Sequence, residues 1–205
     1  MRSEPAWLTP EEQAAWRPIV ALLFRLPAAL DAQLQKDAGI SHFEYLVLAN
    51  LSEAPDRTLR MSDLAALASG SLSRLSHVVS RLEARGWVRR EPCPGDGRYI
   101  NAVLTEDGWA KVTATAPGHV AAVRALLIDV LTPQQLQDFG AISSAVLQGK
   151  DQNDDPERTV ASPQRNRLTA LTGAAGRLAA WRAARLPRTR VRPGPGRAGR
   201  AASAR

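Results

Sequence analysis

Apolar residues recur at helical spacing along most of the first 147 residues, and clear helix-start signals divide them into segments. Capping boxes open three of these segments, at 9–12, 41–44 and 132–135, and Thr105 followed by two acids opens a fourth. Prolines inside the first and the fifth segment are expected to bend or interrupt them. The pattern predicts helices over about 10–36, 42–51, 62–68, 71–86, 106–131 and 133–147.

The period changes after Gly86. Residues 87–90 and 99–104 resemble two short strands, and the residues between them, 91–98, are dense in turn formers. The stretch 52–58 is polar and reads as a loop. A hairpin that directly follows a pair of short helices is the outline of a winged helix-turn-helix. We therefore expect a mainly α fold with a small β-hairpin wing.

The helix that begins at Ser71 is strongly amphipathic. On a helical wheel its apolar residues Leu75, Val78, Val79 and Leu82 share one arc and should face the core. The opposite face carries short hydroxyls, one imidazole and guanidinium groups, with no carboxylate at its centre. Small side chains let a helix enter the major groove of DNA, where Arg, Ser and His can reach bases or phosphates. The candidate contacts are Ser71, Ser73, Arg74, Ser76, His77, Ser80, Arg81 and Arg90.

Charge supports this interpretation only when it is read locally. The net charge of +7 arises from residues 158–205, which hold twelve arginines and no lysine or acid, so that residues 1–157 carry a net −5. Within that acidic body, residues 57–98 carry eight arginines against four acids. A basic segment in an acidic protein is the electrostatic pattern expected of a phosphate-binding surface, although a solvated charged face has the same composition.

The order of several motifs resembles the MarR family of winged helix-turn-helix regulators, from about Thr9 to Leu147. By that resemblance 71–85 is the recognition helix, and Arg98 is a wing-tip arginine that enters the minor groove while Asp96 holds it. His77 departs from the arginine that many relatives carry, which leaves the contacted base open. The matching motifs are 61–65 (MSDLA), 71–75 (SLSRL), 81–86 (RLEARG), 96–98 (DGR) and 104–108 (LTEDG).

The resemblance also implies a homodimer formed through the terminal helices, 10–36 and 106–147, around a DNA-binding lobe at 40–104. Such a dimer would bind double-stranded DNA at a pseudo-palindrome and regulate transcription. We expect a repressor rather than an activator, acting by occupying promoter DNA. Relatives often bind small aromatic or anionic effectors between these two regions. The residues expected to line that cleft are Trp16, His42, Tyr45 and Trp109, which could equally be core or interface aromatics.

The rest of the sequence limits which other functions are possible. No phosphate loop, nucleophile elbow, paired-carboxylate or metal-ligand pattern appears, so we expect no enzyme, no metal and no cofactor. One cysteine, Cys93, and no apolar stretch long enough for a bilayer favour a cytoplasmic protein without membrane contact. A protein–protein adaptor on the same fold, and a cysteine-based redox-responsive regulator, are the rival functions.

The chain divides into a winged helix-turn-helix domain at 1–148 and a tail at 149–205. The tail begins with an acidic linker, 151–157, and continues as an Arg-, Ala-, Gly- and Pro-rich segment without a clear core, so we expect it to be disordered. It either adds non-specific phosphate affinity, or is an inert extension, or is the product of a shifted reading frame.

Overall fold

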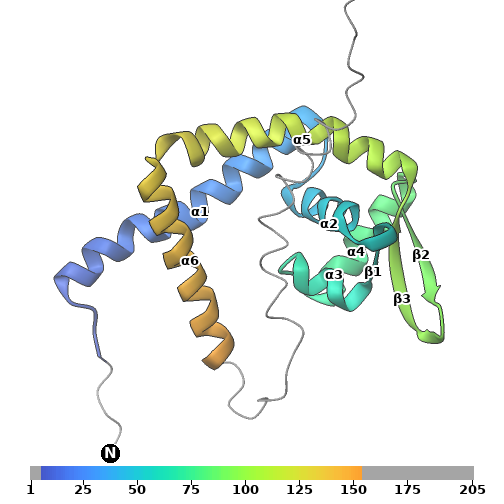
Figure 1. Ribbon diagram of the computed structural model, residues 1–205, viewed down its shortest axis with the longest axis horizontal. Helices are drawn as coiled ribbons and strands as arrows, with labels where there is room; N and C mark the ends of the chain where they lie inside the picture. The colour runs from blue at the N-terminus through green and yellow to red at the C-terminus, as the bar shows by residue number, and fades with distance from the viewer. Residues whose placement is uncertain (1–5, 154–205) are drawn as a thin grey trace, which may run out of the picture.

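The computed structural model describes residues 6–153, and their side chains up to residue 149. The arginine-rich tail, 158–205, lies outside this range. Figure 1 shows a helical protein with one small sheet. The elements are α1 (Pro10–Ala38), α2 (His42–Glu53), η1 (Pro55–Arg57), β1 (Thr58–Arg60), α3 (Met61–Leu67), α4 (Leu72–Ala84), β2 (Val88–Cys93), β3 (Asp96–Leu104), α5 (Glu106–Leu126), η2 (Ile128–Val130) and α6 (Pro133–Asn153).

The helices begin where the capping signals predict. At the start of α1 the Thr9 hydroxyl accepts from the Glu12 N–H at 3.2 Å, and the Glu12 carboxylate accepts from the Thr9 N–H at 2.7 Å. Ser41 and Glu44 form the same reciprocal pair before α2. Helix α1 ends at Ala38 and is capped by Gly39, whose φ of 64° lies in the left-handed region that glycine adopts without strain.

Three details of the expected helices differ. The prolines within α1 and α5, which were expected to bend or interrupt these helices, do not interrupt them, and the helices run unbroken over 29 and 21 residues. Their rings are exposed, so the carbonyl that each leaves unpaired can be hydrated. The fifth helix ends at Leu126 and gives way to η2, five residues earlier than expected. Helix α6 continues to Asn153, so the predicted linker begins inside a helix.

The sheet has three antiparallel strands in the order β1-β3-β2, one more than expected. Strand β1 begins at Thr58, the last residue of the expected loop 52–58, and continues to Arg60; Thr58 pairs with Val103. Both hairpin strands also extend into the predicted turn, to Cys93 and from Asp96. The hairpin projects from the body with mostly exposed residues, so no alternation of apolar and polar positions marks these strand ends.

One core holds the lobe together. Leucines of α2, α3 and α4 pack with the inner residues of the sheet and with Val112 of α5. The C-terminal half of α1 contributes Leu30 and Leu34 and runs beside α5, above the lobe in Figure 1. Over residues 6–153 no single helix is long and apolar enough to cross a membrane; only the α5–α6 pair, bent by 104°, has that length and composition when taken together.

Candidate nucleic-acid interface

Helix α4 presents the polar face that the wheel predicts. Its apolar residues Leu75, Val78, Val79 and Leu82 are all buried, and the opposite residues, Ser73, His77, Ser80 and Ala84, are all exposed. The helix begins at Ser71, whose hydroxyl accepts from the Arg74 N–H at 3.2 Å. Burial of one face therefore fixes which residues α4 offers to a partner.

The turn that leads into α4 sets the spacing of the helix pair. Ser69 adopts a positive φ of 53°, and Gly70 lies directly against the ring of Phe43 in α2. A Cβ on Gly70 would come within 2.6 Å of the Phe43 ring, so only glycine allows this approach. The α3–α4 turn is thereby seated on α2.

Glu83 is the one acidic residue of α4, and its carboxylate is paired with an arginine. Arg90 of β2 contacts it through Nη1 at 2.7 Å, and the Arg90 backbone N–H donates to the same carboxylate at 2.8 Å. Arg90 Nη2 also donates to the Ser76 carbonyl at 2.7 Å and the Ser80 hydroxyl at 3.1 Å. Arg90, which the sequence predicts as a DNA contact, therefore also fixes the wing to α4.

Arg81 joins α4 to α2. Its Nε lies 3.1 Å from Oε1 of Glu44, whose side chain is only 6% exposed. Burial by itself would raise the pKa of Glu44, but hydrogen bonds from Ser41 and Arg81 hold that pKa below its ordinary value. The carboxylate therefore stays charged, and half of the Arg81 side chain remains accessible beside the exposed face of α4.

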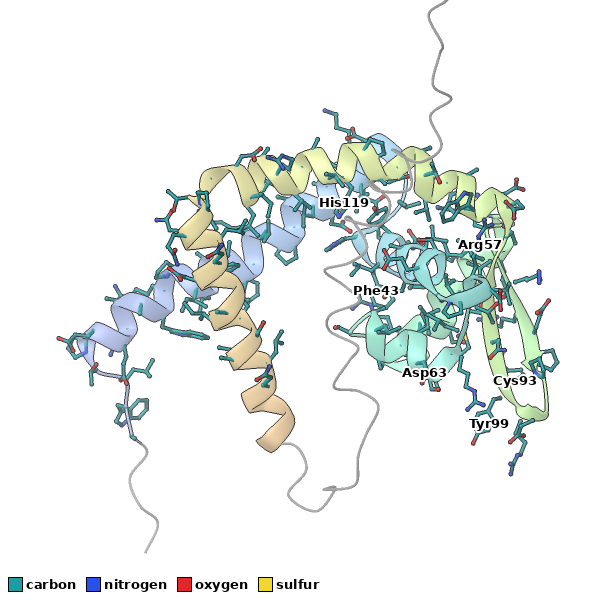
Figure 2. The ribbon with its side chains drawn as sticks, in the orientation of Figure 1. Phe43, Arg57, Asp63, Cys93, Tyr99 and His119 are labelled. Carbon is teal, nitrogen blue, oxygen red and sulfur yellow. The ribbon has the colours of Figure 1, made fainter. Side chains whose placement is uncertain are left out.

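Arg98 stands at the wing tip and is held by Asp96. Its Nε and Nη2 donate to the two carboxylate oxygens at 2.9 and 2.8 Å, and its backbone N–H donates to Oδ1 at 3.2 Å. These bonds lower the pKa of Asp96. The Arg98 side chain is nonetheless 85% exposed. Figure 2 labels the next residue, Tyr99, near the far end of the wing. Asp96 thus orients a guanidinium that is free to contact a ligand.

The four expected effector residues do not meet within one chain. His42 and Tyr45 lie together, whereas Trp109 lies under the Arg57 guanidinium at 4.5 Å and about 15 Å along α5 from His119. Trp16 is half exposed, about 22 Å along α1 from Asp31, the residue that accepts from the His42 N–H. Only a second chain could bring Trp16 to the other residues.

His119 of α5 lies against both His42 and Tyr45, and it is not among the residues that the sequence predicts for the cleft. Its ring centroid lies 4.4 Å from that of Tyr45 and 5.8 Å from that of His42. Its Nδ1 is buried without a hydrogen-bond partner among the described residues. Burial, with His42 as a second cause, lowers the pKa of His119 to about 4. Helical spacing places His119 on the same face of α5 as residues 112, 115 and 116, which the structure buries, but the sequence does not show which element covers that face.

Other kinds of site find less support. Within residues 6–149, no group of three His, Cys, Asp or Glu side chains is placed to hold a metal ion. A surface depression of about 460 Å³ lies where β1 and β3 meet the start of α5. Its two cations are already paired, Arg57 with Glu106 at 2.7 Å and Arg89 with Glu91 at 2.8 Å. This depression therefore offers no unpaired charge to an anion.

A helix pair followed by a β-hairpin that pairs with a strand before the helices, with a carboxylate-free helix face and an arginine at the hairpin tip, defines a winged-helix DNA-binding domain. A sequence model of the MarR family matches residues 38–98. The HTH-type transcriptional regulator PecS of Dickeya dadantii is 32% identical over 120 residues, which are 56% of this chain and 69% of PecS. The chain belongs to the MarR family, whose members are transcriptional regulators rather than enzymes.

Two further relatives agree. Sco3205 of Streptomyces coelicolor, a MarR family regulator solved in complex with DNA, is 49% identical with a TM-score of 0.69, covering 72% of this chain and 92% of Sco3205. The HTH-type transcriptional repressor Rv2887 of Mycobacterium tuberculosis is 30% identical over 125 residues, which are 60% of this chain and 88% of that repressor. The predicted fold class and family are therefore confirmed.

The contact between Arg90 and Glu83 yields a first prediction. Arg90→Ala leaves the Glu83 carboxylate uncompensated beside the DNA-facing side of α4, so DNA affinity should fall by roughly tenfold. The double variant Arg90→Ala with Glu83→Gln removes that charge and should recover most of the loss. Fluorescence anisotropy on labelled promoter DNA measures both. A double variant as weak as the single one would show that Arg90 acts by direct contact instead.

The buried imidazole yields a second prediction. The folded pKa of His119, about 4, lies below its ordinary value of 6.5, so the unfolded chain takes up the proton first as pH falls. His119 should therefore lower the free energy of unfolding progressively between pH 6.5 and 4, and have no effect above pH 7. Urea unfolding of His119→Gln should show a shallower acid loss than the natural protein. His77→Gln, on an exposed face, is the control; identical slopes for all three would refute the account.

Proposed function

We propose that this protein is a sequence-specific transcriptional repressor that binds a pseudo-palindromic operator in double-stranded DNA as a homodimer, in the cytoplasm. The observation that carries the proposal is the exposed face of α4, free of carboxylates, with Arg98 beside it on the wing. A B-DNA major groove is about 12 Å wide and admits a helix whose outer side chains are small. Ser73 and His77 would reach base edges, while Arg74 and Arg81 would contact phosphates.

The wing supplies a second contact. A narrow minor groove concentrates negative potential and attracts an inserted guanidinium. Asp96 limits the orientations of Arg98 before binding, so less conformational freedom is lost when the side chain enters the groove. The 49% identity to Sco3205, which was solved with DNA, supports the same arrangement here. We infer repression for two reasons. The relative Rv2887 is named a transcriptional repressor, and a protein that occupies a promoter most simply blocks transcription from it.

The homodimer is supported by apolar surface that the single chain leaves open. Large apolar side chains are exposed along the N-terminal half of α1 and along the far ends of α5 and α6, away from the lobe core. A surface of this extent on one chain marks a protein interface. A two-fold dimer would place two recognition helices about 34 Å apart, in successive major grooves. The exposed residues are Trp7, Leu8, Trp16, Ile19, Leu23, Phe24, Leu126, Val130, Ile142, Val146 and Leu147.

We place the effector at the cluster of His42, Tyr45 and His119. The cluster joins α2 of the DNA-binding lobe to α5. The buried Nδ1 of His119 has no hydrogen-bond partner among the described residues, so a ligand could supply one. Aromatic rings and a neutral imidazole suit a small aromatic acid. Such a ligand releases DNA only if it favours a dimer with the wrong helix spacing, because equal affinity for both states shifts nothing.

The wing contact is tested by removing its guanidinium. Arg98→Ala should weaken binding to promoter DNA by roughly 5- to 100-fold, because one groove contact is lost while α4 still binds. Arg124→Ala is the matched control: it removes one charge from α5, far from the DNA-facing side, and should leave affinity unchanged. Mobility shift at constant salt measures both. Equal affinity of Arg98→Ala and the natural protein would contradict the assignment of the wing.

The dimer is tested independently of DNA. Phe24 is 75% exposed on α1, so Phe24→Asp should not disturb the fold of one chain but should place a charge in the apolar interface. Light scattering should give twice the mass of one chain for the natural protein and a single-chain mass for Phe24→Asp. Ile100→Asp, on the exposed wing, should remain dimeric. A single-chain mass for the natural protein would exclude this interface.

A further inference from the structure

The arginines of the DNA-binding lobe are held in two different ways. Among the described residues, five of them form ion pairs with carboxylates: Arg57, Arg81, Arg89, Arg90 and Arg98. Arg60, Arg74 and Arg85 lie instead over aromatic rings, those of Tyr99 at 4.8 Å, Phe43 at 4.1 Å and Trp87 at 5.1 Å from the ring centroid. Arg57 has both kinds of partner, and Arg85 also donates to the Gly39 carbonyl at the corner between α1 and α2. A carboxylate offsets part of the positive charge of the arginine it pairs with, whereas an aromatic ring positions the cation without adding an opposite formal charge.

Arg74 lies on the recognition helix, where a phosphate contact is expected, but Arg60 lies elsewhere. It is the last residue of β1, opposite Asn101 of β3, and it is exposed. Its Nη2 lies 3.8 Å from the Cys93 Sγ. Arg60 also acts electrostatically at the wing tip. The hydrogen bonds from Arg98 are the largest cause of the lowered pKa of Asp96, and the positive charge of Arg60 lowers that pKa further. Arg60 therefore occupies the space between the start of α3 and the wing.

The figures place this space on the side of the lobe away from α1 and α5. In Figure 2, Tyr99 projects from the wing toward α3, where Asp63 is labelled, and Cys93 lies higher on the same hairpin. If α4 lies in a major groove and the wing tip in the neighbouring minor groove, one sugar–phosphate strand passes between them. A cation between α3 and the wing would face that strand.

We propose that Arg60 is a DNA-phosphate contact positioned by the ring of Tyr99, between the contacts made by α4 and by Arg98. This inference rests on the proposed function, because it presumes that α4 and the wing bind one duplex. An exposed cation–π contact contributes little to folding, so a purely structural role would leave DNA binding unchanged. A phosphate contact, by contrast, is independent of sequence and depends on salt.

The salt dependence of binding is the main test. Arg60→Gln should lower the slope of log K against log salt by about 0.9 and reduce affinity for promoter and unrelated DNA by the same factor. Arg60→Lys keeps the charge and should keep the slope. Arg89→Gln, which removes a carboxylate-paired arginine from the same sheet, should leave the slope unchanged. A slope for Arg60→Gln equal to that of the natural protein would overturn the proposal.

The role of the ring is tested with two variants of Tyr99. Tyr99→Phe retains the aromatic face and should bind DNA as the natural protein does, whereas Tyr99→Leu should lose several-fold in affinity. Combining Tyr99→Leu with Arg60→Gln should cause little loss beyond that of Arg60→Gln alone, since the ring acts through the guanidinium. Additive losses would show that Tyr99 contacts DNA independently and would refute its positioning role.

Cys93 provides a second readout, because it is the single cysteine of the chain and lies next to Arg60. Bound duplex should slow its reaction with a bulky maleimide, whereas unchanged reactivity would contradict a DNA strand at this position.

The results for Arg98→Ala and Arg60→Gln together distinguish failure of this inference from failure of the proposed function. If Arg98→Ala weakens binding and Arg60→Gln does not change the slope, only the present inference fails. If neither variant has an effect, the proposed function fails with it.

Discussion

Burial of one side of α4 is the constraint on which the rest of the structure depends. Four apolar residues of α4 enter the core between α2, α3 and the sheet, and this fixes the rotation of the helix. The opposite side is then left with hydroxyls, an imidazole and guanidiniums. The nearby acids are paired with arginines, Glu83 of α4 with Arg90 of β2 and Glu44 of α2 with Arg81 of α4 itself. A surface that phosphates can approach results from packing and from these two ion pairs together.

Two further polar contacts connect the DNA-binding lobe to the helices that we propose form the dimer. At the corner between α1 and α2, Arg85 at the end of α4 donates to the Gly39 carbonyl at 3.2 Å, and Lys111 of α5 donates to the Ala38 carbonyl at 2.6 Å. Both cations also lie over the ring of Trp87. A shift of α1 or α5 would therefore move α4 as well. The His42–His119 cluster adjoins this corner, so the proposed effector would have a short physical route to α4.

Much of the fold was predictable because its signals are local. Capping residues gave the helix starts, and the 3.6-residue period of α4 identified both its buried and its exposed face. Strand β1 was missed because three residues are too few for a period, and the pairing with β3 that makes it a strand is non-local. The contacts of Arg90, Arg60 and His119 were missed for a related reason. Each depends on which distant element comes to lie beside the residue, and spacing along the chain does not record that.

Site-specific photo-crosslinking to DNA tests the central claim most directly. A photoreactive amino acid at Ser73, on the exposed face of α4, should crosslink to bases of promoter DNA, and the product should be lost when unlabelled promoter is added in excess. The same amino acid at Ser144 of α6, which is equally exposed but distant from the lobe, should give no crosslink. Crosslinking from Ser144 without crosslinking from Ser73 would contradict the account, because DNA would then bind to a different face of the protein.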